Sequence, residues 1–565
     1  MKFQDWPYER PDLEAFGKRF KELLRRLEDA ATADDANEAF EAINAARVSV
    51  SSMFAIARIR HTIDTTDPFY KEEQSFIDDH SPVYQGLIND YYKALVASGH
   101  RGALEERWGR QLFATAELGL KTFDPSIVEE LKEENRKSSE YVKLVASARI
   151  DFDGEERTLS QLAPFLQSTD RETRRRAADA RYAFFEANEA IVDGIYDDLV
   201  KLRTRIARKL GYANFVELAY ARMARTDYGP RQVAAFREQV LEHIVPVAQA
   251  LGERRRARLG VDKLRYYDGL SFLTGNPTPK GGPDWIVARA KAMYAEMSPE
   301  TDEFFRFLLD GGLMDLESKK GKRVGGYCSF IGSRKAPFIF SNFNGTAHDV
   351  DVLTHEAGHA FQAYLSRDFA ETVPEYVHPT LDACEIHSMS MEFFAWPWME
   401  SFFEEDTDKY KFSHLSGALT FLPYGAAVDE FQHVVYERPE LTPAERKAAW
   451  REIERKYCPG REYDDMPFLE RGGYWHQQQH IFKSPFYYID YALAQICALQ
   501  YWQRANGDRA EAWDSFVRLC RAGGSDSFTG LVRLAGLRSP FEDGCVSSIV
   551  GDIAAWLNGI DDKAL

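Results

Sequence analysis

The chain has 565 residues, of which 44% are hydrophobic and 28% charged, a composition typical of soluble globular proteins with a large core. Lys and Arg number 71 and Asp and Glu 89, and the net charge of −18 argues against nucleic-acid partners and against binding to a membrane surface. No apolar run approaches the roughly 20 residues that a membrane span needs. The first residues lack the apolar segment of a secretory signal, and the six cysteines lack CxxC spacing, so we expect a cytoplasmic protein with reduced thiols.

The first two hundred residues read as successive helices. Apolar residues recur there at spacings of three and four, as in Phe16, Phe20, Leu23, Leu24 and Leu27. Residues 151–155 predict a turn, and a short helix is expected around 159–166. This part of the chain is therefore predicted to be all helical.

Two breaks interrupt the helical pattern further on. Residues 274–283 are too rich in Gly and Pro to continue a helix, and we expect a helix to restart with Asp284 as its N-cap. The second break surrounds residues 319–326. Two short runs after it, 327–331 and 337–343, are rich in aromatic and branched residues and predict a β-hairpin. From Ala347 onward the pattern is helical again, so the fold class is mainly α with a small β element.

The motif His355-Glu356-Ala-Gly-His359 lies on this last helical stretch. Four residues of α-helix turn through roughly 400°, so the two histidines project from one face and can hold one Zn²⁺. Glu356 lies beside the metal position, where it can take a proton from a metal-bound water. Two incidental surface histidines are the alternative, but apolar neighbours such as Leu353 and Phe361 indicate a buried helix, where an unpaired group of this kind is costly. The motif therefore predicts a catalytic zinc site.

A catalytic zinc needs a third protein ligand and an open position. Gln362 and Leu365 stand where the metzincin pattern HExxHxxGxxH requires Gly and His, so that class is excluded. Further downstream, the acids and histidines are Glu371, Glu375, His378, Asp382, Glu385, His387 and Glu392.

We select Glu385 as the third ligand. Residues 380–394 read as a helix on which Glu385, Ser388 and Glu392 share a face, so that neighbours can support the ligand. Glu392 is then a supporting or a solvated carboxylate. Asp351, one turn before His355, either orients that imidazole or faces solvent.

Tyrosines and histidines gather in residues 472–491. A peptidase needs donors that stabilise the oxyanion beside the metal, and Tyr hydroxyls or His N–H groups do this. The alternative is an aromatic core turn after Pro485. Beside a zinc motif the catalytic interpretation is favoured.

These residues resemble the thimet oligopeptidase and oligoendopeptidase F family of zinc metallopeptidases, and the oligoendopeptidase F branch most closely. The similar segments are His355–Phe361, Glu385–Phe393, His480–Ala492, Gly523–Ser525 and the Phe338–Asn344 strand. The resemblance covers the whole chain in length and order of parts. It implies an elongated, mainly α zinc-peptidase fold with a small β-sheet beside the zinc helix and a deep substrate channel. We expect residues 1–210 to form a helical domain and one channel wall, and residues 211–565 the catalytic domain.

The resemblance also implies roles for single residues. His355, His359 and Glu385 bind one Zn²⁺ per chain, and Glu356 is the general base. The oxyanion donors are His480 and a tyrosine, for which we rank Tyr491 first, Tyr488 second and Tyr487 third. The match is loose there, because this chain has Lys483-Ser-Pro where the thimet branch has glycines.

The implied activity is a zinc metallo-endopeptidase that hydrolyses internal bonds of short unfolded peptides, with the Phe338–Asn344 strand pairing with the substrate backbone. A zinc carboxypeptidase or dipeptidyl carboxypeptidase is the first alternative, and it needs a cation that grips the terminal carboxylate. The second is a scaffold protein with structural zinc, against which Glu356 argues because such sites need no base. Substrate preference and oligomeric state do not follow from the sequence.

Overall fold

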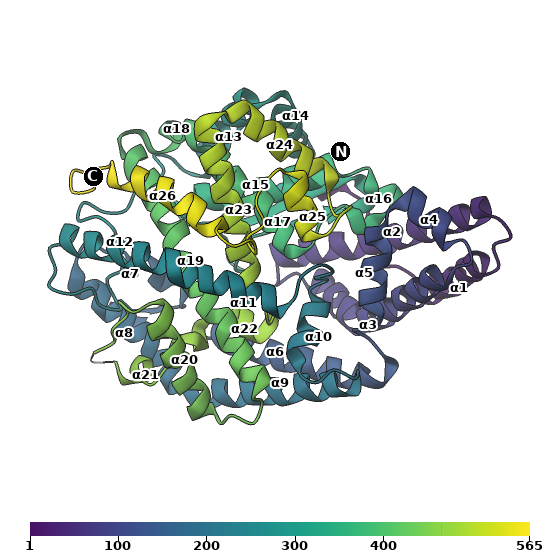
Figure 1. Ribbon diagram of the computed structural model, residues 1–565, viewed down its shortest axis with the longest axis horizontal. Helices are drawn as coiled ribbons and strands as arrows, with labels where there is room; N and C mark the ends of the chain where they lie inside the picture. The colour runs from purple at the N-terminus through teal and green to yellow at the C-terminus, as the bar shows by residue number, and fades with distance from the viewer. Residues whose placement is uncertain (465) are drawn as a thin grey trace.

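The computed structural model describes residues 1–464 and 466–565. It is mainly α, as predicted, and elongated, with the N-terminal helices extending at one end, on the right of Figure 1. The first nine helices of the chain are α1 (Leu13–Glu28), α2 (Ala33–Ile63), α3 (Pro68–Ala97), α4 (Arg101–Trp108), α5 (Arg110–Leu120), α6 (Val128–Ala146), α7 (Ala163–Leu166), α8 (Arg171–Ala187) and α9 (Glu189–Lys209). Of these, α1–α5 form the extended end (Figure 1).

The predicted Gly- and Pro-rich break separates two groups of helices in the middle of the chain. These helices are α10 (Phe215–Arg222), α11 (Pro230–Gln239), α12 (Val245–Arg258), α13 (Pro283–Met297) and α14 (Pro299–Gly311). The expectation that Asp284 caps α13 was wrong. The helix starts at Pro283 with Gly282 as its N-cap, because a proline at the first helical position has its φ already set and loses no hydrogen bond.

The centre of the molecule is built by α15, α17 and α23, with α17 packed against both of the others (Figure 1). The helices after the strands are α15 (His348–Leu365), α16 (Phe369–Thr372), α17 (Leu381–Phe394), α18 (Glu400–Phe403), α19 (Thr407–Glu437), α20 (Pro443–Tyr457), α21 (Pro467–Glu470), α22 (Gln479–Lys483), α23 (Tyr488–Gly507), α24 (Arg509–Ala522), α25 (Phe528–Leu534) and α26 (Cys545–Asn558). Gly358 lets α15 approach α17 closely, because a Cβ there would lie 2.6 Å from the main-chain oxygen of His387.

Two small sheets accompany the helices. The strands β1 (Ile150–Phe152) and β2 (Glu155–Arg157) form a hairpin where the sequence predicted only the turn. The predicted hairpin of β4 (Tyr327–Ile331) and β5 (Ala336–Phe343) is confirmed, and β3 (Met314–Glu317) joins it in the order β3-β5-β4. The expectation that Phe338–Asn344 offers its edge to the substrate was wrong, because β5 is the central strand and is paired on both sides. The edge strands are β3 and β4.

The hydrophobic core extends through most of the chain. One large cluster includes α9 and the central helices, and α1–α5 enclose a second cluster to which Val373 and Tyr376 also contribute. The domain boundary near residue 210 stays a prediction. Within the described residues, no helix has the length and apolar character that crossing a membrane requires.

Candidate metal centre

The metal-site helix α15 is tied to the end of the central strand β5. The Asp349 carboxylate accepts hydrogen bonds from the main-chain N–H groups of Asn344 (2.8 Å) and Gly345 (2.7 Å), which close the turn between strand and helix. His355 and His359 follow on one face of α15, with ring centroids 5.0 Å apart. The predicted helical geometry of the motif is thus present.

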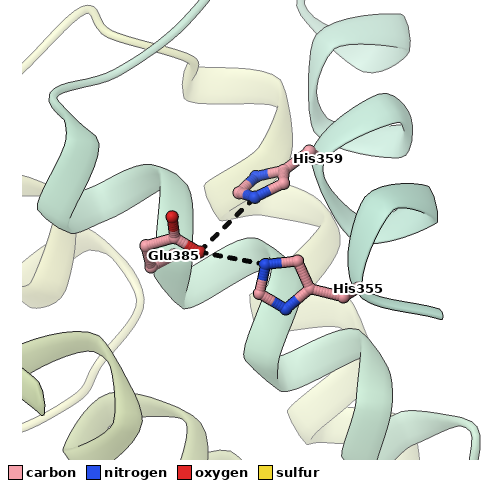
Figure 2. Close-up of side chains that lie close together, drawn as sticks. All are labelled: His355, His359 and Glu385. Carbon is pink, nitrogen blue, oxygen red and sulfur yellow. Dashed lines mark ion pairs between the residues drawn. The ribbon is translucent and has the colours of Figure 1, made fainter. Parts of the chain in front are cut away.

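The two histidines of α15 meet Glu385 of α17 (Figure 2). Glu385 Oε2 lies 3.2 Å from His355 Nε2 and 3.4 Å from His359 Nε2. One candidate ligand atom from each of the three residues lies within 4.8 Å of the other two. Two imidazole nitrogens and one carboxylate oxygen are a usual donor set for a catalytic zinc, and they leave a position open for substrate.

Glu385 is held by two hydroxyl groups. Ser388, one turn further along α17, donates to Oε2 at 2.8 Å, as their spacing predicted, and Tyr487 donates to Oε1 at 2.6 Å. Burial raises the pKa of Glu385, but His359 and His355 outweigh burial and hold it well below its usual range. The carboxylate is therefore ionised, as a metal ligand must be.

Glu392 orients the first histidine. It accepts hydrogen bonds of 2.7 Å from His355 Nδ1 and, on its other oxygen, from His414 Nε2. The bond at Nδ1 leaves His355 Nε2 free for a metal. Asp351 accepts a hydrogen bond from Tyr410, and among the described residues it makes no hydrogen bond to His355. His414 was missed in the sequence, where nothing sets it apart from other helical histidines.

Glu356 is buried, and its Oε2 has no hydrogen-bond partner among the described residues. Gly326, just before β4, lies beside the other oxygen, since a Cβ there would be 3.2 Å from Oε1. Burial raises the pKa of Glu356. An unpaired acceptor beside a zinc-type donor set is what a general base needs, so the residues fit a catalytic zinc and an attacking water.

His480 has one ring nitrogen already engaged. Its Nδ1 accepts from the amide of Gln478 (2.8 Å), whose oxygen in turn accepts from Tyr424. The proton of the neutral ring is therefore on Nε2. Burial, reinforced by Lys483, lowers the pKa of His480 to about 4, so the ring stays neutral at physiological pH.

The three candidate tyrosines surround His480. The ring of Tyr488 lies 5.1 Å from that of His480 and that of Tyr491 5.9 Å. Tyr487 is 5.8 Å away and directs its hydroxyl to Glu385. Tyr488 and Tyr491 line a cavity next to the metal cluster, so the structure brings every predicted site residue into one region.

This cavity has a volume of about 760 Å³. His355 and Glu392 form part of its wall, and Met389, Ala418 and Phe421 make another part apolar. A loop that includes residues 276–278 covers one side. No Arg or Lys is among the described residues that line the cavity.

Comparison with known proteins gives a consistent result. The chain matches the Peptidase M3 N-terminal domain over residues 3–123 and Peptidase family M3 over residues 165–272 and 299–550. It is 59% identical to a solved structure described as PZ peptidase A with inhibitor 2, with a TM-score of 0.96 and complete coverage of both chains. The structure of oligoendopeptidase-F from Enterococcus faecium, at 16% identity and a TM-score of 0.62 over 98% of this chain and 99% of that one, shares the fold.

A curated relative, the oligoendopeptidase F homolog of Borreliella burgdorferi, is 22% identical over 381 residues. The match covers 65% of this chain and 62% of the relative, so the chain spans about three fifths of that protein's length.

Proposed function

Because the chain belongs to peptidase family M3, which it matches over more than half of its length, we propose that it is a zinc metallo-endopeptidase that hydrolyses internal bonds of short unfolded peptides. The observation that carries the proposal is the buried Oε2 of Glu356, which has no hydrogen-bond partner in the described part of the chain and lies beside the cluster of His355, His359 and Glu385. A structural zinc site would have no use for this carboxylate.

His355, His359 and Glu385 would hold Zn²⁺, which polarises the scissile carbonyl and makes water more acidic when it is bound. Glu356 takes the proton of the attacking water at its free oxygen. Its raised pKa suits a group that must accept this proton and then return it to the leaving nitrogen.

The developing oxyanion needs donors that are already in place. His480 offers Nε2–H, because its Nδ1 is held as an acceptor by Gln478. Tyr491 faces the cavity, whereas the Tyr487 hydroxyl is engaged by Glu385. This arrangement supports His480 and Tyr491 as the oxyanion donors and gives Tyr487 the task of orienting a metal ligand.

The substrate backbone would pair with the edge strand β4 instead of β5. The strand β4 begins directly after Gly326, which lies against Glu356, and its outer edge is unpaired among the described strands. A peptide strand added at this edge would therefore pass close to the proposed general base. Main-chain pairing of this kind is largely independent of side chains and favours extended, unfolded peptides.

The test uses a peptide of about ten residues with blocked ends and an internal fluorophore–quencher pair. Internal cleavage, lost with a chelator and restored by zinc, is the expected result. Glu356→Gln should bind zinc and fold like the wild type but lose about 10²- to 10⁴-fold in kcat, the usual contribution of a general base. Persistent turnover by this variant would show that the base is assigned wrongly.

A carboxypeptidase or dipeptidyl carboxypeptidase is the alternative. The absence of Arg and Lys from the described lining of the cavity argues against an exopeptidase. If the protein were one, Lys483, which is exposed and lies near His480, would be the cation that binds the terminal carboxylate. Peptides that differ only in a free or amidated C-terminus separate the two functions. Equal kcat/KM supports an endopeptidase, and cleavage of the free acid alone supports the alternative.

A further inference from the structure

The segment that carries the proposed oxyanion donors contains a strained turn. Phe486, between His480 and Tyr491, has φ of +66°, a conformation that bulky residues rarely adopt. Its side chain is fully buried and packs against Phe215 and Tyr436. Such a conformation persists only where the surroundings enforce it, and observed strain of this kind clusters at functional sites.

Both main-chain polar groups of Phe486 are held by buried side chains from other helices or loops. The N–H donates to Gln432 Oε1 of α19 at 2.8 Å. The carbonyl accepts from Arg225 Nη2 at 2.7 Å, and the same nitrogen pairs with the Asp490 carboxylate at 2.5 Å. Arg225 thus links the strained turn to the first turn of α23, next to Tyr491.

A second buried arginine holds the preceding turn. Arg203 of α9 donates through Nη2 to the carbonyl of Phe482 at 2.5 Å and through Nη1 to that of Ile481 at 3.3 Å. Glu134 and Tyr436 engage its remaining donors. Arg203 therefore restrains the main chain of α22, the helix that carries His480, in the same way as Arg225 restrains the Phe486 turn.

Neither arginine is placed to act on a substrate. The side chains of Arg203 and Arg225 have exposures of 1% and 0%, and neither lines the cavity. These two guanidinium groups nevertheless donate hydrogen bonds to three main-chain carbonyls of one short segment, those of Ile481, Phe482 and Phe486. Buried charges are expensive, and a merely apolar core would have held the helices without them.

We propose that Arg225 is a positioning residue, which holds the Phe486 turn and the start of α23 so that Tyr487 and Tyr491 point at the metal centre, with Arg203 doing the same for His480. The proposal rests on the proposed function for its catalytic consequence. The structural part of the proposal, that Arg225 restrains residues 484–491, is independent of the proposed function.

The decisive variants separate positioning from stability. Arg225→Met alone leaves the buried Asp490 carboxyl without its partner and is expected to be unstable. Arg225→Met/Asp490→Leu removes both charges with side chains of similar size, so the thermal midpoint should return close to that of the wild type, while the Phe486 carbonyl still lacks its donor. Arg225→Lys keeps one nitrogen that can reach both acceptors, and it should retain most of the activity even if the double variant folds poorly.

For the double variant we expect kcat to fall by about 10- to 100-fold, the scale of a displaced catalytic group, with KM nearly unchanged. Zinc affinity should fall less than kcat, because Tyr487 is the contact between this segment and a proposed metal ligand. In a Tyr491→Phe background the same pair of substitutions should lower kcat by a smaller factor than in the wild type, since one of the two tyrosines that Arg225 positions has lost its hydroxyl. Arg446→Met is the matched control, because Arg446 is equally buried and pairs with Asp197 away from the site. It should lower the thermal midpoint without lowering kcat.

Recovery of kcat together with stability in the double variant would overturn the proposal. Hydrogen exchange of residues 484–491 tests it without any activity, and faster exchange in the double variant than in Arg446→Met is expected. If the wild type cleaves no peptide, the proposed function fails, yet exchange still decides whether Arg225 restrains the segment. Unchanged exchange refutes that restraint.

Discussion

Glu392 gives the sharpest test of how the proposed metal centre is held. Its two oxygens each accept a 2.7 Å hydrogen bond, from His355 Nδ1 and from His414 Nε2. The indole N–H of Trp396 donates to His414 Nδ1 at 3.2 Å, so that nitrogen carries no proton and His414 must offer its proton at Nε2. Burial raises the pKa of Glu392, but the two histidines outweigh burial and lower it to about 2, so it is a carboxylate with two donors directed at it.

Glu392→Gln replaces this acceptor pair by one acceptor and one donor of the same shape. One of the two imidazoles then faces an amide N–H with its own N–H. His414 cannot move its proton to Nδ1 because Trp396 donates there, and His355 cannot move its proton to Nε2 because that nitrogen must stay free for a metal. Loss of a hydrogen-bond partner behind a metal-binding histidine lowers metal affinity by about 10- to 100-fold, which corresponds to roughly 1.4–2.7 kcal/mol. We expect this loss in the Glu392→Gln variant.

Zinc affinity is measured by competition with a chromophoric chelator, beside kcat and the thermal midpoint of the apo-protein. His414→Phe is the control, because it removes only the outer donor and leaves the bond between Glu392 and His355; its zinc affinity should fall less than that of Glu392→Gln. A zinc affinity of Glu392→Gln within twofold of the wild type would refute the reasoning.

Four further outcomes are expected. Gly358→Ala places a Cβ 2.6 Å from the α17 backbone and should cost about 1–3 kcal/mol of unfolding free energy, whereas Gly252→Ala, with nothing within 4 Å on α12, should stabilise by up to about 1 kcal/mol; equal effects in chemical denaturation would contradict the packing argument. Burial lowers the pKa of His387 to about 3, below its unfolded value. Its stabilisation is therefore complete above about pH 6.5 and is lost as the pH falls towards 3. When the pH falls from 6.5 to 4.5, the unfolding free energy of the wild type should drop by roughly 2–3 kcal/mol more than that of His387→Leu. Parallel pH profiles of the two proteins would exclude this role for His387. Tyr491→Phe should lower kcat by about 10²- to 10³-fold. A larger loss of kcat in Tyr487→Phe would indicate that Tyr487, and not Tyr491, is the oxyanion donor. Chelation should lower the thermal midpoint and added zinc restore it, because an ion that binds only the folded state stabilises it; an unchanged midpoint would argue against a metal at this cluster.

Much of the candidate metal centre could be predicted because its geometry is local. A helix places residues three, four and seven positions apart on one face, so the paired histidines of α15 and the supported Glu385 of α17 follow from spacing alone. The β4–β5 hairpin follows from two runs of strand-forming residues, and the Gly- and Pro-rich break before α13 from composition. These features depend on interactions within a few residues, which the order of the amino acids determines directly.

What the tertiary structure alone decided are the contacts between distant segments. The pairing of Glu392 with His414, the position of β5 between two other strands, and the hold of Arg225 on Phe486, 261 positions away in the sequence, have no local periodicity. Each depends on which helices pack together, and that choice is made by the summed burial of apolar surface over the whole core. The amino-acid order therefore determined which groups could do chemistry, and the packing determined which of them are aimed at one another.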